Sequence, residues 1–311
     1  MATEHVIDPS RIHHHWDNSL EPALTVASGD VVEFDLKMCG VGQLERGMPF
    51  EETKFDFDTL YNLVGPVYVE GAEPGDTLEV EILDLRPGDW GWTCVLADLG
   101  LLPEDFPEPY MRYFDLTKGA TTTLVDGVEI PIRPFLGTMG NHPDEPATAA
   151  PFPPHKAGGN VDTRHLVKGV SLHLPVYVEG ALFSCGDPHA AQGDGEVCVA
   201  AIETSMHATL RFRLHKSPSS APWFIVPDTS STAMPDGGYY GTMGIDGDLM
   251  QGAKKAVRGM VELLGVRHGL EPEDAYVLCS LTGDLKIFEI VDSGVWNVGF
   301  ALPRSVFTET G

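Results

Sequence analysis

The sequence lacks long apolar runs and has few positive charges. Its 311 residues contain no apolar stretch long enough to cross a bilayer, so we expect no transmembrane helix. The segment Met1–Asp17 has no basic region followed by an apolar core, which argues against a secretory signal. Only 20 Lys and Arg accompany 46 Asp and Glu, giving a formal charge of −26. This charge repels nucleic acid, anionic membranes and anionic substrates, whereas a small neutral substrate is unaffected by it.

Cysteine is also scarce, and the cysteines do not form close pairs. An odd number of scattered cysteines without a Cys-x-x-Cys motif is typical of reduced thiols in a cytoplasmic protein. Cys185 lies beside the most polar segment, but no cation or nucleophile motif flanks it, so we expect it to be a small packed side chain. The five cysteines are Cys39, Cys94, Cys185, Cys198 and Cys279.

Two common catalytic and binding motifs are missing as well. There is no Gly-x-Ser-x-Gly elbow for a serine nucleophile, and no glycine loop between a strand and a helix for a phosphate. A serine–lysine scheme is weakened because Lys168 is the nearest lysine to the polar segment.

The chain contains 42% hydrophobic residues, enough for a sizeable core in one large domain or in two to three subdomains.

The apolar pattern predicts strands through most of the chain and helices only near its end. Thr77–Ile82 alternates polar and apolar residues, and a hairpin is expected around Ser28–Asp30. Leu249–Leu264 carries one apolar stripe, starts after Asp246 or Asp248 and should end at Gly265. The other expected elements are a helix from Pro272 to about Ser280 and strands over Trp223–Val226, Leu285–Val291 and Val295–Leu302.

An internal repeat supports this fold class. Pro66–Ala72 recurs letter for letter as Pro175–Ala181, and a Gly-Asp turn and a further strand follow each copy. We therefore predict a mainly β protein with a C-terminal α/β portion, whose sandwich-like or barrel-like units derive from a related pair of β segments. The expected division is 1–85 with 160–215 for the core and site, 86–159 for a long loop-rich wall of the site, and 216–311 for the α/β portion.

The segment Gly158–Glu203 concentrates the polar chemistry of the chain. Short apolar runs that predict strands, Val170–Val178 and Val197–Ile202, alternate with acids and imidazoles. Side chains two apart on a strand share a face, as Asp187 does with His189. This arrangement indicates a metal site or an acid/base site. Each Gly-Asp pair alone favours an ordinary turn, but a turn does not require His189, Gln192 and Glu196 as well, so the cluster as a whole favours a functional site.

Further histidines lie outside this segment. His13, His14 and His15 form a second group of possible ligands, for which surface or packed positions are an equal alternative. In the proline- and glycine-rich region before position 160, His142 and His155 are candidates for substrate contact.

The strings GGNVD and LPVYVEGALFSCGDPHAAQGDGEVCVAAIE resemble the acetamidase/formamidase family. His15–Asn18, GPVYVEGAEPGDTLEVEIL, AKKAVRGMVELL and EDAYVLCSLTGDLKIFEIVD match in the family's order, so the resemblance spans nearly the whole chain. It implies a mainly β homo-oligomer that hydrolyses short linear amides to ammonia and a carboxylate, with a divalent metal near the acidic motif. The chain departs from the family pattern at Asn141–Pro143, which puts the preferred amide in doubt.

Within this framework we assign roles to the clustered residues. Asp187 and His189 are the expected metal ligands, completed by Glu203 or Asp162, with zinc or calcium as the ion. Glu196 or Glu203, with Asp162, would act in acid/base catalysis, and the candidates for substrate binding are His142, Gln192 and Asn160. Two alternatives remain: hydrolysis of a larger amide, and a non-catalytic β protein that binds a metal or a polar ligand.

Overall fold

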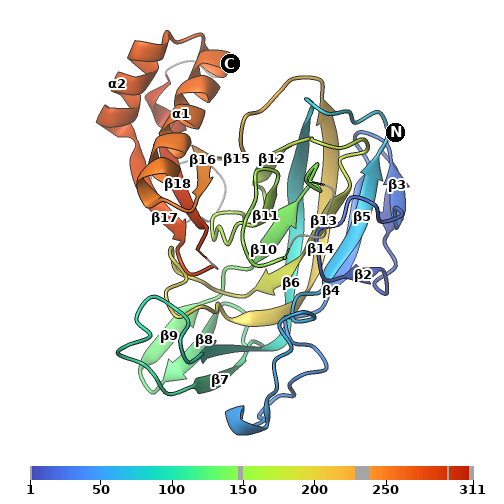
Figure 1. The fold of residues 1–311 in the computed structure, drawn as a ribbon, viewed down its shortest axis with the longest axis vertical. Coiled ribbons are helices and arrows are strands. Elements are labelled where there is room, and N and C mark those ends of the chain that lie inside the picture. Colours follow the sequence, from blue (N-terminus) through green and yellow to red (C-terminus); the bar gives the residue numbers. More distant parts are fainter. Residues whose placement is uncertain (1, 146–149, 228–237, 293, 308–311) are drawn as a thin grey trace.

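Strands dominate the regular structure of the molecule, and both α-helices lie near its C-terminal end (Figure 1). The computed structural model describes residues 2–145, 150–227, 238–292 and 294–307. The helices are α1 (Leu249–His268) and α2 (Pro272–Thr282), with short 3-10 turns at Phe50–Glu52 and Arg304–Val306. The predicted fold class, mainly β with a C-terminal α/β portion, is confirmed.

A long antiparallel pair forms the first layer. The alternating residues that begin at Thr77 continue as β6 (Thr77–Val95), which pairs with β14 (Glu203–His215) from His215↔Thr77 to Glu203↔Trp92. Because alternate side chains of a strand point to opposite faces, one face of this pair can be apolar throughout. The other strands of the layer are β1 (Glu4–Val6), β4 (Val31–Leu36) and β12 (Ser171–Pro175).

The second layer is centred on β13 (Phe183–His189). It pairs with β5 (Leu63–Val69) and β10 (Phe135–Gly140), and it meets the first layer where His189 pairs with Glu203. The ring of Phe183 packs edge-on against that of Phe212 in β14, 5.1 Å between centroids, so an apolar core fills the space between the layers. The remaining strands here are β2 (Ile12–His13), β3 (Leu24–Val26) and β11 (Gly158–Asn160).

The C-terminal portion extends the same sheet. From β12 the order continues through β15, β16, β18 and β17, and α1 packs against β16 and β18. Asp248 caps α1 through the backbone N–H of Gln251, as expected. The expected end at Gly265 is wrong: the helix continues to His268, because Gly269 takes the left-handed conformation that ends it. The strands are β15 (Trp223–Val226), β16 (Tyr239–Asp246), β17 (Asp284–Glu289) and β18 (Trp296–Pro303).

Three expectations about local structure are wrong. The segments around Ser28–Asp30 are not a hairpin, because β3 pairs with β5 while β4 pairs with β1 and β14. Val197–Ile202 is not a strand but irregular chain that leads into β14. The region 86–159 is less irregular than predicted: it holds the end of β6, the strands β10 and β11, and three more strands, β7 (Tyr110–Asp115), β8 (Thr121–Val125) and β9 (Val128–Pro131).

The two copies of the internal repeat lie against each other. The N–H of Val69 donates to the carbonyl of Gly180 at 2.9 Å, and the N–H of Gly180 donates to that of Ala72 at 2.9 Å. Gly180 has a φ of +74°, and an added Cβ would lie 2.1 Å from the ring of Tyr68. The two copies of the repeated sequence therefore hydrogen-bond to each other, although the first belongs largely to β5 and the second is irregular chain after β12.

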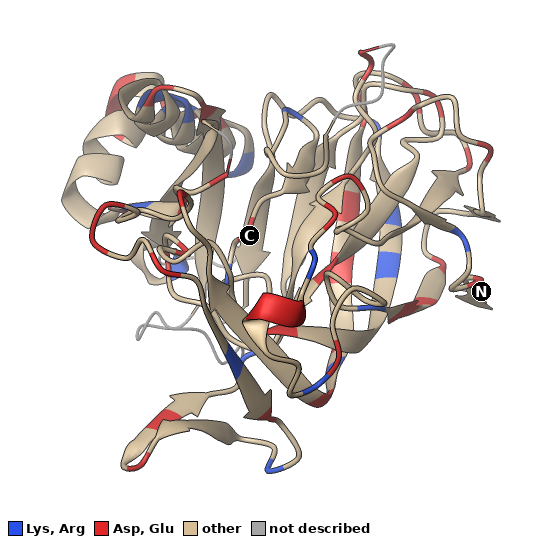
Figure 2. Ribbon diagram, turned by 60° about the horizontal axis from the view of Figure 1, so that its bottom comes forward, with Lys and Arg blue, Asp and Glu red and all other residues tan. Residues whose placement is uncertain are grey.

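Acidic positions occur on strands, loops and helices alike (Figure 2). Neither α1 nor α2 combines the length and the hydropathy that a membrane-crossing helix needs.

The contact between Gly241 and Phe224 yields a stability prediction. Gly241 of β16 faces Phe224 of β15, and an added Cβ would lie 2.1 Å from the Phe224 ring. We expect Gly241→Ala to lower the free energy of unfolding by about 1–3 kcal/mol, because the ring is fully buried and cannot move aside. Gly265→Ala in α1, where the nearest atom is 3.5 Å from the added Cβ, is the control and should not destabilise. Equal denaturation midpoints for Gly241→Ala and the unsubstituted protein would contradict this.

Candidate active site

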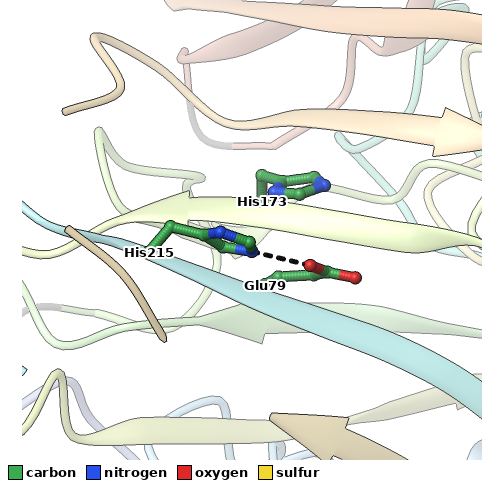
Figure 3. A group of neighbouring side chains, drawn as sticks. All are labelled: Glu79, His173 and His215. Atoms are coloured by element: carbon green, nitrogen blue, oxygen red, sulfur yellow. Dashed lines mark hydrogen bonds and ion pairs between the residues drawn. The ribbon is translucent and has the colours of Figure 1, made fainter. Parts of the chain in front are cut away.

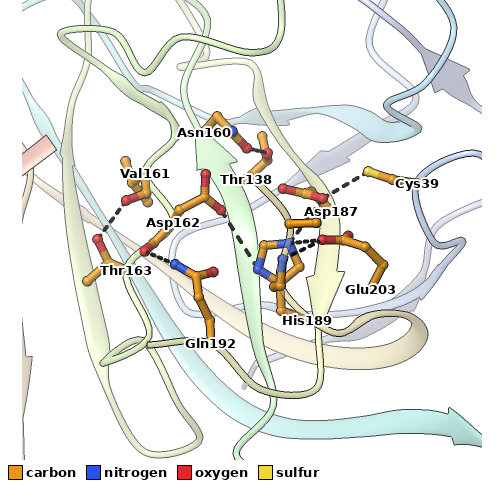
Figure 4. Close-up of polar contacts among 12 residues, drawn as sticks. Cys39, Thr138, Asn160, Val161, Asp162, Thr163, Asp187, His189, Gln192 and Glu203 are labelled. Atoms are coloured by element: carbon orange, nitrogen blue, oxygen red, sulfur yellow. Dashed lines mark hydrogen bonds and ion pairs between the residues drawn. The ribbon is translucent and has the colours of Figure 1, made fainter. Parts of the chain in front are cut away.

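Acidic and imidazole side chains converge where β13 ends and β14 begins (Figure 4). His189 Nε2 lies 3.2 Å from Asp187 Oδ1 and 3.3 Å from Glu203 Oε1. The pairing of His189 with Glu203 brings these side chains together from the two layers. All three are buried, so each polar atom depends on its neighbours rather than on bulk water.

Two further carboxylates reach the same point from loops. Asp162 follows β11 and places Oδ1 3.8 Å from His189 Nδ1. Glu196 lies in the irregular chain before β14, and one of its oxygens lies within 4.8 Å of donor atoms of Asp162 and His189. Asp162, Asp187 and Glu196 have φ values of +39°, +52° and +47°. Such left-handed conformations cost free energy in non-glycine residues and are typical of functional sites.

Gly137 of β10 leaves room for this convergence. An added Cβ there would lie 2.5 Å from Asp162 Oδ1, 2.5 Å from Asp187 Oδ2 and 2.6 Å from His189 Cε1. The carbonyl of Gly137 also accepts the N–H groups of Val161 and Asp162, at 3.0 and 3.1 Å. Because Gly137 has no side chain, the carboxylates have room to converge. The backbone carbonyl of the same residue accepts a hydrogen bond from Asp162 and so fixes its position.

Burial and mutual repulsion shift the titration of these groups. Burial, and then the Asp187 carboxylate, raises the pKa of Asp162 well above its usual value. Burial, and then Asp162, does the same to the pKa of Glu196, and burial raises the pKa of Glu203 to about 7. Burial opposes protonation of His189, but Glu203 and Asp187 outweigh it and raise its pKa. If all of these carboxyl groups were ionised, the group would hold more negative charge than the single imidazole could neutralise.

The donor atoms of this group suit a divalent cation. Asp162 Oδ1, Glu203 Oε2 and His189 Nδ1 are buried without a hydrogen-bond partner among the described residues. Donor atoms of Cys39, Asp187 and Glu203 lie within 4.8 Å of one another, as do those of Asp162, His189 and Glu196. A cation would compensate the repelling carboxylates and use the unpartnered atoms, so the residues fit the metal that the resemblance implies.

A cavity of about 400 Å³ opens onto this group. Asp187, His189, Glu196 and Glu203 lie at its polar end, and its described lining contains no Lys or Arg. The other walls are apolar and largely aromatic: Phe55, Phe57, Leu60, Tyr61, Trp92, Leu96, Leu99 and Phe152. Trp92, Leu96, Leu99 and Phe152 come from the region 86–159, which the sequence suggested as a wall of the site.

The structure brings most of the predicted site residues together. Asn160 lies beside the acids and donates to Asp292 Oδ2 at 2.7 Å, while Gln192 donates to the backbone carbonyl of Asp162 at 2.9 Å. Neither of these two residues, nor Asp162, belongs to the described lining of the cavity. His142 is outside the lining as well, and its contacts are different: its Nε2 lies 3.3 Å from Ser184 Oγ, and its ring packs against Trp16. His142 lies close to the end of β10 in the sequence, but this closeness did not indicate on which face of the strand its side chain would lie.

Other candidates also have separate positions. None of His13, His14 and His15 lies in the described lining, and His13 contacts Ser184 Oγ at 2.9 Å. Asp194 pairs with His165 at 3.1 Å. Cys185 is a buried free thiol whose pKa burial raises, as expected for a packed side chain.

Three cavity residues were missed by the sequence interpretation. The Cys39 thiol donates to Asp187 Oδ1 at 2.8 Å, and Tyr61 and Asp292 both contact Asn160. Burial, and then Asp162, raises the pKa of Asp292 well above its usual value. Asp292 closes the EIVD string that matched the family, which was a usable signal. Cys39 and Tyr61 stand in segments without a motif.

Comparison with known proteins shows what the chain is similar to. The acetamidase of Mycolicibacterium smegmatis is 28% identical over 247 residues, 60% of this chain and 61% of that protein. The formamidase of Methylophilus methylotrophus is 28% identical over 262 residues, 66% of this chain and 64% of that protein. The matched part therefore spans less than two thirds of the length of these relatives.

Solved structures match over almost the whole chain. A Bacillus halodurans acetamidase superposes with a TM-score of 0.85 at 30% identity, covering 96% of both chains. A recombinant predicted acetamidase/formamidase from Thermoanaerobacter tengcongensis gives 0.88 at 27% identity, covering 98% of this chain and 97% of its own. The model of the Acetamidase/Formamidase family matches residues 2–150 and 145–309. By sequence and by fold, the chain belongs to the acetamidase/formamidase family.

Proposed function

We propose that this protein is an amidohydrolase that cleaves linear amides to ammonia and a carboxylate. The observation that carries the proposal is the buried group of Asp187, His189 and Glu203 at the polar end of a cavity with no Lys or Arg in its described lining. The activities named for the relatives, acetamidase and formamidase, support the same chemistry. A neutral amide also suits a chain with a formal charge of −26.

The residues have separate tasks in this proposal. Asp187, His189 and Glu203 would hold a divalent cation, for which the mixed nitrogen and oxygen donors favour zinc over calcium. When bound, such a cation supplies a water of lowered pKa and polarises the amide carbonyl. Glu196, whose pKa is raised well above its usual value by burial and by Asp162, keeps a proton for the departing nitrogen. Asp162 Oδ1 lies 3.8 Å from His189 Nδ1 and has no hydrogen-bond partner among the described residues, so it would be available to complete the ligand shell.

We further propose a cytoplasmic homo-oligomer. The free cysteines suit a reducing compartment. Exposed apolar side chains on α2 and β17, among them Tyr276, Leu281 and Leu285, suit a subunit contact.

Substitutions at the convergence point test the reaction. We expect Asp187→Asn and His189→Ala each to lower ammonia release from formamide, acetamide and propionamide by at least about 100-fold, because each removes a group that the chemistry needs. His207→Ala on β14, a histidine whose side chain is 64% exposed, is the matched control and should keep full activity. Chelation should also abolish turnover. The non-catalytic alternative would gain if chelation lowered the melting temperature and no amide ever released ammonia.

The size of the cavity favours a larger amide as a second candidate substrate. A volume of about 400 Å³ lies within the range of roughly 300–1,000 Å³ that drug-sized ligands occupy. We expect Phe152→Ala to lower kcat/KM for phenylacetamide by about 10-fold to 100-fold through lost apolar contact, and to change acetamide turnover little. Phe106→Ala, a 58% exposed residue outside the described lining, is the control. A parallel loss for both substrates would show that Phe152 does not select amide size.

The space at Gly137 yields a prediction about metal content. Gly137→Ala places a methyl group 2.5 Å from two carboxylate oxygens, so we expect metal affinity and activity to fall about 10-fold or more. Gly193→Ala, with nothing within 4 Å of the added Cβ, is the control. Metal analysis and ammonia release measure the outcome, and unchanged metal content in Gly137→Ala would refute the placement of the ion.

A further inference from the structure

A second group of ligating side chains lies at the far end of the long strand pair. Glu79 of β6, His173 of β12 and His215 of β14 come from three adjacent strands, with His173 opposite Glu79 in the register (Figure 3). His215 ends β14, whereas Glu203 of the candidate active site begins it. With about 3.3 Å per residue, the two groups are separated by on the order of 40 Å along the strand.

The donor atoms of these three residues are close together. His215 Nε2 lies 2.7 Å from Glu79 Oε2, and one ligand atom from each residue lies within 4.8 Å of the other two. The second carboxylate oxygen, Oε1, accepts Arg213 Nη1 at 2.9 Å and Ser171 Oγ at 3.0 Å. These contacts fix the orientation of the carboxylate and leave Oε2 directed at the imidazoles, as partners of metal-binding carboxylates do.

His173 supplies an unused nitrogen. The residue is 5% exposed, and its ring stacks on Trp223 with centroids 3.7 Å apart and an interplanar angle of 2°. Its Nε2 is buried and has no hydrogen-bond partner among the described residues. Stacking alone does not explain a buried nitrogen without a partner.

An ion can reach this group from outside. His173 and His215 line a cavity of about 290 Å³ between the sheet and α1, with Ser217, Trp223 and Arg267 among the other lining residues. The side chain of His215 is 43% exposed, so it can turn from Glu79 toward an ion with little cost in packing.

We propose that Glu79, His173 and His215 bind one divalent transition-metal ion at a site separate from the candidate active site. Two imidazoles and one carboxylate favour zinc, cobalt or nickel over magnesium or calcium, which prefer oxygen ligands. Three protein ligands also leave a coordination position open toward the cavity. Because the ligands come from three strands, the ion would join β6, β12 and β14 where the sheet passes under α1.

Zinc binding to the chelator-treated full chain tests the proposal. We expect His215→Ala and Glu79→Gln each to bind one zinc ion fewer per chain, or to bind that ion about 10-fold to 100-fold more weakly, by equilibrium dialysis and metal analysis. Zinc should raise the melting temperature of the unsubstituted protein more than that of His215→Ala. His207→Ala, an exposed histidine on the same strand, should behave as the unsubstituted protein.

The two sites are told apart by combining variants. In Asp187→Asn, which alters the candidate active site, the loss caused by His215→Ala should persist. The side chain of His215 is 43% exposed, so His215→Ala should fold even if a variant of the buried His173 does not. The proposal is overturned if folded His215→Ala and Glu79→Gln bind zinc with the stoichiometry and affinity of the unsubstituted protein.

Discussion

The electrostatic cost of burying several carboxylates beside one imidazole governs the candidate active site. Asp162, Asp187, Glu196 and Glu203 are all buried, and burial itself raises the pKa of Asp162 and Glu196. Such a cluster requires a scaffold that holds it against its own repulsion. The two layers, the pairing of His189 with Glu203 and the space at Gly137 together meet that requirement. Asp162, Asp187 and Glu196 adopt left-handed conformations, so the backbone is strained where these acids converge.

Much of the fold was accessible from the sequence, since strand and helix periods are local properties. The alternation from Thr77, the apolar stripe from Leu249 and Pro272 at a helix start all identified elements that form. The pairing partner of a strand, in contrast, depends on segments that are far away in the sequence. The turn at Ser28–Asp30 therefore resembled a hairpin turn, although its two strands belong to different layers. The end of α1 was missed because Gly265 and Gly269 are equally plausible in sequence, and only the second takes a positive φ.

The candidate site was predictable as a segment but only partly as a geometry. Asp187 and His189 share a strand, so their proximity followed from spacing alone. Cys39, Tyr61 and Asp292 come from distant parts of the chain, and the neighbours of Cys39 and Tyr61 form no motif that indicates a site. His142 shows the converse error, because a polar residue in a proline- and glycine-rich region packs instead with His13 and Trp16. The positions of these residues depend on packing between segments that are far apart in the sequence, which a local sequence pattern does not reveal.

The strand β14 has Glu203 at one end and His215 at the other, and its pairing with β6 covers the whole distance. A slip of one residue in that ladder would turn every side chain of the strand to the opposite face. It would carry Glu203 out of the cavity and His215 away from Glu79 in the same movement. The chemistry at both ends of β14 therefore depends on a single register, that of β14 against β6.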